Sequence, residues 1–108
     1  MADNLIVWTA AKEVSSAITS MVTTYRTLRT VKKQESIMLK EKIRAFQTIA
    51  RIKNMGEIAR AMVDEIAKTQ AYIDRQNLSP TALKYSMDYL EQLNEVLKNN
   101  MEVYINGV

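Results

Sequence analysis

Six basic residues between positions 26 and 51 are the part of this sequence best suited to bind a ligand. Successive members are 3, 4, 7, 4 and 7 residues apart, so on one continuous helix all six lie within about 60° of one another. They are Arg26, Arg29, Lys33, Lys40, Arg44 and Arg51. Such a cationic edge can bind the phosphates of nucleic acid or an acidic partner. More commonly, however, such an edge is a solvated face, or pairs with acidic residues elsewhere in the chain.

The residue types that catalysis needs are scarce. Cysteine and histidine are both absent, which removes thiolate chemistry, the commonest general base and the commonest metal ligand. No glycine-rich phosphate-binding motif occurs. Glu91 and Glu95 lie one helical turn apart and could share a metal, but such a pair on a charged stripe is more often solvated. We therefore expect a protein that is not an enzyme and that holds neither a metal ion nor a cofactor.

The composition predicts that these side chains are carried by helices. The 108 residues include only two glycines and one proline, and 47% of them are apolar, which favours a single all-α domain over residues 1–108. No glycine or proline interrupts residues 4–54, so we expect one long N-terminal helix there, of about 75 Å, which could be kinked near residues 30–36. Two further helices, at about 57–76 and 80–105, then fold back to give an antiparallel, coiled-coil-like bundle.

The last of these helices carries an apolar seam. Its members alternate at spacings of 4 and 3 residues, as in a coiled coil, and they are Leu83, Met87, Leu90, Asn94, Leu97, Met101 and Tyr104. A single asparagine in such a seam either fixes the register or oligomeric state, or lies at the hydrated edge, and the sequence does not favour one over the other. We interpret the seam as a protein-interaction surface.

A bulky apolar cluster lies close to the N-terminus. Leu5, Ile6 and Trp8 belong to a run of four large apolar residues, which cannot all face the same side of a helix. These three residues could anchor a partner, although core packing is the favoured interpretation of the lone tryptophan.

The charge is unevenly distributed. Residues 26–60 hold ten Lys or Arg and three Glu, a net charge of +7, whereas residues 61–108 hold four Lys or Arg and seven Asp or Glu, a net charge of −3. The chain can therefore fold back and neutralise part of itself. Equally, the basic stretch of one subunit can meet the acidic helix of another.

These observations favour a non-enzymatic interaction or assembly protein that self-associates or binds a protein partner through its apolar seams. A helix of about 75 Å would need such a partner, because helices of about 30–40 Å cannot cover it. Nucleic-acid binding through residues 26–51 is the alternative, although no exposed aromatic residues for base stacking are evident. Peripheral membrane contact is disfavoured, because a bundle buries its apolar faces. Without a secretory signal or a long apolar run, we expect a cytoplasmic protein.

Overall fold

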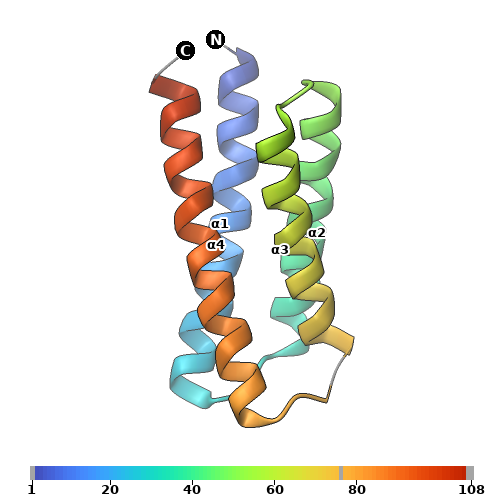
Figure 1. The fold of residues 1–108 in the computed structure, drawn as a ribbon, viewed down its shortest axis with the longest axis vertical. Helices are drawn as coiled ribbons and strands as arrows, with labels where there is room; N and C mark the ends of the chain where they lie inside the picture. Colours follow the sequence, from blue (N-terminus) through green and yellow to red (C-terminus); the bar gives the residue numbers. More distant parts are fainter. Residues whose placement is uncertain (1, 76, 107–108) are drawn as a thin grey trace.

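Four helices make up the fold. The computed structural model describes the main chain of residues 2–75 and 77–106, and the side chains of residues 5–75 and 77–101. The helices are α1 (Ala2–Leu28), α2 (Lys33–Ile52), α3 (Glu57–Arg75) and α4 (Pro80–Asn106), and these ranges contain no strand. They run alternately up and down, and each packs against two neighbours, so that α4 closes the ring against α1 (Figure 1). The predicted all-α antiparallel bundle is therefore confirmed.

The helix predicted over residues 4–54 is instead two antiparallel helices, because the chain reverses at residues 29–32. Arg29 has a φ of 56°, in the left-handed region, and its backbone N–H donates to the Tyr25 carbonyl at 2.6 Å. Lys32 is extended, with φ −76° and ψ 131°, and directly precedes α2. The left-handed residue costs about 1–2 kcal/mol. The reversal compensates for this cost, because it packs the apolar faces of α1 and α2 against each other.

The other two turns lie where the sequence predicts them. In the turn between α2 and α3, Asn54 has a positive φ of 50°, whereas Gly56 does not have a positive φ. At the start of α4, the Ala82 N–H donates to Ser79 Oγ at 3.1 Å, which makes Ser79 the N-cap. Pro80 is the first residue of α4, where its missing N–H has no helical partner to lose. Residue 76, the predicted end of the third helix, lies outside the described residues.

One face of each helix contributes to a continuous core along the bundle. The largest fully buried side chains come from all four helices and include Ile18, Met21, Leu39, Phe46, Ile66, Met87, Leu90 and Leu97. The Cα trace extends 43 Å along its longest axis, about half the length expected of a single helix over residues 4–54. The helices therefore cover one another, and no long helix is left uncovered.

A small polar cluster is buried between α2 and α3. The Gln70 side-chain amide donates to Ser36 Oγ at 2.8 Å and to the Ser36 carbonyl at 3.2 Å, and the Ser36 hydroxyl donates to Asp74 at 3.3 Å. A sliding movement of one helix along the other would leave these buried groups without partners, which costs more than a surface hydrogen bond. The cluster thereby fixes how the surfaces of α2 and α3 meet.

Truncation of the core at Phe46 should strongly destabilise the bundle. Phe46 is fully buried, so we expect Phe46→Ala to lower the free energy of unfolding by about 3–5 kcal/mol. The matched control is Met38→Ala, because Met38 lies on the same helix with 55% of its surface exposed; we expect a change of at most about 0.5 kcal/mol. Urea denaturation followed by circular dichroism measures both. Equal effects of the two substitutions would contradict the packing described here.

Candidate anion-binding face

Four of the six basic residues that the sequence places on one helical edge lie together on α2. The buried face of this helix consists of Ser36, Leu39, Ile43, Phe46 and Ala50. Lys33, Lys40, Arg44 and Arg51 are all exposed and lie on one flank of that buried face. The same flank points toward α3, because Gln47 within it donates to Asp64 of α3 at 3.1 Å.

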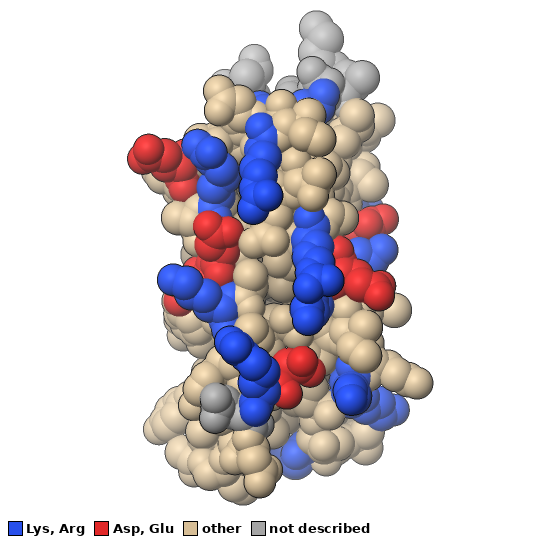
Figure 2. Space-filling view, turned by 90° about the vertical axis from the view of Figure 1, so that its right-hand side faces the viewer, with Lys and Arg blue, Asp and Glu red and all other residues tan. Residues whose placement is uncertain are grey.

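Helix α3 adds three more cations beside this flank. Arg60, Lys68 and Arg75 are exposed. Arg60 of α3 and Arg51 of α2 line the same hollow, which has a volume of about 210 Å³. Two guanidinium groups from adjacent helices therefore lie beside one site. We call the seven cations the basic face: Lys33, Lys40, Arg44, Arg51, Arg60, Lys68 and Arg75. Figure 2 shows Lys and Arg side chains over most of the length of the surface formed by α2 and α3.

Several cations outside the basic face form ion pairs. In the described part of the chain they include Arg26 with Glu91, Lys42 with Glu13, Lys84 with Asp88 and Lys98 with Glu95. No member of the basic face forms an ion pair with a described residue. Acidic residues also lie on this surface, where Asp64 accepts a hydrogen bond from Gln47 and Asp74 accepts one from Ser36. These carboxylates keep their negative charge, but the seven cations form no ion pair with them, which leaves the cations available to an approaching anion.

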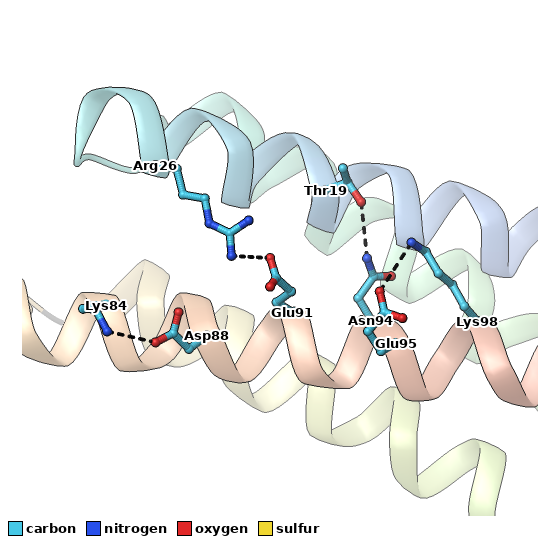
Figure 3. Close-up of polar contacts among 8 residues, drawn as sticks. All are labelled: Thr19, Arg26, Lys84, Asp88, Glu91, Asn94, Glu95 and Lys98. Atoms are coloured by element: carbon cyan, nitrogen blue, oxygen red, sulfur yellow. Dashed lines mark hydrogen bonds and ion pairs between the residues drawn. The ribbon is translucent and has the colours of Figure 1, made fainter.

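The two remaining predicted cations, Arg26 and Arg29, do not join this face. The chain reverses after them, which carries α2 away from the helical register that would align all six residues. Arg26 points to α4 and forms an ion pair with Glu91 at 2.6 Å (Figure 3). The hydrogen bond and negative charge of Glu91, with a smaller contribution from Asp88, raise the pKa of Arg26. Arg29 lies in the turn, with its guanidinium 5.9 Å from the centre of the Tyr25 ring.

The predicted interaction seam lies within the chain's own core. Met87, Leu90, Asn94, Leu97 and Met101 are buried, and Leu83 is half-buried against the same core. The side chain of Tyr104 lies outside the described residues. The α4 helix turns this face toward the interior, where it packs against the neighbouring helices α1 and α3. The seam is thus intramolecular in this structure.

Asn94 is a buried seam residue and does not lie at a hydrated edge. It is 4% exposed, and its side-chain amide donates to Thr19 Oγ1 of α1 at 3.2 Å (Figure 3). Its Oδ1 atom is buried without a hydrogen-bond partner. The hydrogen bond supports the interpretation that this asparagine fixes a register, here that of α4 against α1 within a single chain.

The N-terminal cluster remains on the surface. Leu5 is 60% exposed, Ile6 and Trp8 are also exposed, and only Val7 between them is buried. The Lys12 ammonium lies 4.8 Å from the centre of the Trp8 ring, a cation–π contact. The core-packing interpretation concerns Trp8, which is 37% exposed and lines a hollow with Leu97 and Met101 of α4, so this side chain is partly packed against the bundle. Leu5 and Ile6 are exposed and available to a partner.

Three exposed tyrosines, which sequence reasoning does not single out, line a groove between α3 and α4. They are Tyr72 on α3 and Tyr85 and Tyr89 on α4. Tyr85 and Tyr89 lie one turn apart and off the apolar seam, which is the signal that could have revealed them in the sequence. Tyr72 has no such signal, because only the packing of α3 against α4 brings it to the groove.

The fold is an antiparallel four-helix bundle. Comparison with known proteins identifies no relative of this chain. Searches against protein-family models, curated proteins and solved structures found no match. Within the described residues, no three acidic side chains gather as a metal site, and none of the described helices is long and apolar enough to cross a membrane.

The hydrogen bond between Tyr89 and Glu65 should be visible in a titration. The Tyr89 hydroxyl donates to Glu65 at 2.9 Å, and this bond, with lesser effects of burial and of the Glu65 charge, raises the pKa of Tyr89 above 10.0. We expect Glu65→Ala to lower that pKa, measured by NMR titration of the tyrosine ring. Because the pKa is raised in the folded state, the bond stabilises the fold below the ordinary tyrosine pKa and is lost as the pH rises through the folded-state value.

The control for this titration is Glu13→Ala, which removes a carboxylate that pairs with Lys42 on the opposite side of the bundle. This variant should leave the pKa of Tyr89 unchanged. An equal decrease in the two variants would mean that general charge, and not the hydrogen bond, controls the tyrosine.

Proposed function

We propose that this chain is a non-enzymatic binding protein whose basic face takes an anionic partner. The observation that carries the proposal is the set of seven exposed cations on α2 and α3 that pair with no described carboxylate, whereas Arg26, Lys42, Lys84 and Lys98 each form an ion pair. The absence of histidine and cysteine from the sequence supports a role in binding over one in catalysis.

The geometry of the basic face suits an extended polyanion better than a single small anion. Lys33 and Arg51 are 18 residues apart on α2, which corresponds to about 27 Å along the helix. Each exposed contact with an anionic group contributes little binding free energy by itself. A row of such contacts along two adjacent helices, however, gives an affinity that rises with the number of charges engaged and falls steeply with salt.

Charge reversal on the basic face should abolish binding to a general polyanion. Immobilised heparin is the probe, and the salt concentration needed for elution is the readout. We expect Arg44→Glu with Arg51→Glu to elute at much lower salt than the unmodified protein, because two attractive contacts become repulsive.

The matched control is Lys12→Glu with Lys98→Glu, on α1 and α4. Both double variants lower the net charge from +3 to −1, since each substitution changes it by two. The control should therefore elute at higher salt than the basic-face variant if location matters. Identical elution of the two variants would refute the proposed face, because only total charge would then decide retention.

Self-association is a second candidate function, supported by apolar residues exposed at one end of the bundle. Leu5 near the start of α1 is 60% exposed, and Ile52 and Ile58, which flank the turn between α2 and α3, are 72% and 77% exposed. The start of α1 and this turn lie at the same end of the bundle (Figure 1). Exposed apolar residues grouped in this way are typical of surfaces that contact another protein.

Light scattering coupled to size-exclusion chromatography tests this second candidate. At high salt, where charge contacts are screened, we expect a discrete oligomer that Leu5→Ser with Ile58→Ser converts to monomer. Val96→Ser is the control, because Val96 is an exposed apolar residue of α4. A monomer at every protein concentration tested would exclude self-association.

A further inference from the structure

An open groove of about 680 Å³ lies between α3 and α4. Its size falls within the range of sites for small molecules. Of the four adjacent helix pairs, α3 and α4 make the least extensive contact, which leaves room for this groove. Its walls carry Tyr72, Tyr85 and Tyr89 together with Lys68, Arg75 and Glu65.

The apolar surface of the groove is aromatic. The described residues that line it include no Leu, Ile, Val or Met, and the only other apolar side chain among them is that of Ala82. An amphipathic helix would need aliphatic pockets to receive its apolar residues, and this groove does not offer them. Flat, exposed rings suit ligands that are themselves flat, because the two faces can stack.

The groove is also cationic and joins the basic face. Lys68 and Arg75 line the groove and belong to the basic face, so α3 is the ridge between the two surfaces. The opposing carboxylate, Glu65, already accepts a hydrogen bond from Tyr89 at 2.9 Å. The Lys84 ammonium, which pairs with Asp88, lies outside the groove lining and 5.8 Å from the centre of the Tyr85 ring.

We propose that the groove between α3 and α4 binds the bases of a single-stranded nucleic acid, whose phosphates lie on the basic face. The tyrosine rings stack with the bases, and Lys68 and Arg75 contact the phosphates that connect those bases. This inference rests on the proposed function, since it names the chemical class of the anionic partner. Proteins that bind single strands without sequence preference usually combine aromatic side chains that stack with the bases and a positively charged surface that contacts the phosphates.

The tyrosines are the reason to prefer a single strand to other polyanions. The bases of a duplex are stacked on one another, so their faces cannot reach Tyr72 or Tyr85. An acidic peptide carries charge for the basic face but, in general, no flat rings for the groove. Both remain outcomes of the test below.

Fluorescence anisotropy with a labelled oligo-dT strand of about 12 nucleotides tests the inference. A labelled DNA duplex and a labelled poly-glutamate peptide of similar length are measured in parallel at the same salt concentration. We expect the single strand to bind most tightly. Tyr72→Ala with Tyr85→Ala should weaken this binding by about tenfold to a hundredfold or more, because each ring stacks with a base.

Two further variants separate the contribution of the tyrosine rings from that of their hydroxyl groups and from a general loss of structure. Tyr72→Phe with Tyr85→Phe retains both rings and should bind oligo-dT like the unmodified protein. Trp8→Ala removes an exposed aromatic residue outside the groove and should also leave binding unchanged. Circular dichroism confirms that each variant remains helical.

The salt dependence tests the phosphate contacts separately. Lys68→Gln with Arg75→Gln should flatten the slope of log K against log salt by about 1.4, which corresponds to two lost phosphate contacts on a single strand. The tyrosine variants should weaken binding with little change in this slope.

The outcomes distinguish the inference from the function on which it rests. If duplex binds as tightly as single strand and the alanine variants change nothing, the stacking groove is refuted but the basic face stands. If only poly-glutamate binds, the partner is an acidic protein, and the inference is again overturned. If neither heparin nor any of the three probes binds, both the inference and the proposed function are wrong.

Discussion

The burial of one apolar face on each helix requires the chain to reverse at residues 29–32. The packing of the four helices and the arrangement of their surface charges depend on this reversal. A straight helix through this region would leave the apolar faces of α1 and α2 far apart and without cover within the chain. The reversal places Arg29 in the left-handed region and brings the two faces together. It also decides which cations act together, because it separates Arg26 and Arg29 from the four cations on the flank of α2.

The same packing determines which surface cations lie next to a carboxylate of a neighbouring helix and pair with it. On the sides formed by α1 with α2 and with α4, cations meet carboxylates from a neighbouring helix, as Arg26 meets Glu91 and Lys42 meets Glu13. On the basic face, the nearby carboxylates of Asp64 and Asp74 instead accept hydrogen bonds from Gln47 and Ser36. These acids keep their negative charge but form no ion pair with the basic face, whose cations stay available to an external anion.

The sequence predicts the helical class and two of the three turns, because these depend on composition and on local residue chemistry. At the first turn it predicts no more than a kink near residues 30–36, since the left-handed conformation of Arg29 carries no signature in residue type. The periodicity at Leu90 and Leu97 correctly marks a buried seam, but periodicity cannot say whether the covering helix belongs to the same chain. The tyrosine groove is likewise hidden, because Tyr72 meets Tyr85 and Tyr89 only through tertiary packing.

The order of helix contacts has a consequence for how the molecule is assembled during synthesis. Contacts of α1 with α2, and of α2 with α3, join neighbours in the sequence and need only short loops to close. Contacts made by α4 come later, since both α1 and α3 are complete before Pro80 is synthesised. The hydrogen bond of Asn94 to Thr19 then aligns the last helix. The residues of the basic face are therefore synthesised before the second wall of the groove, which belongs to the last helix.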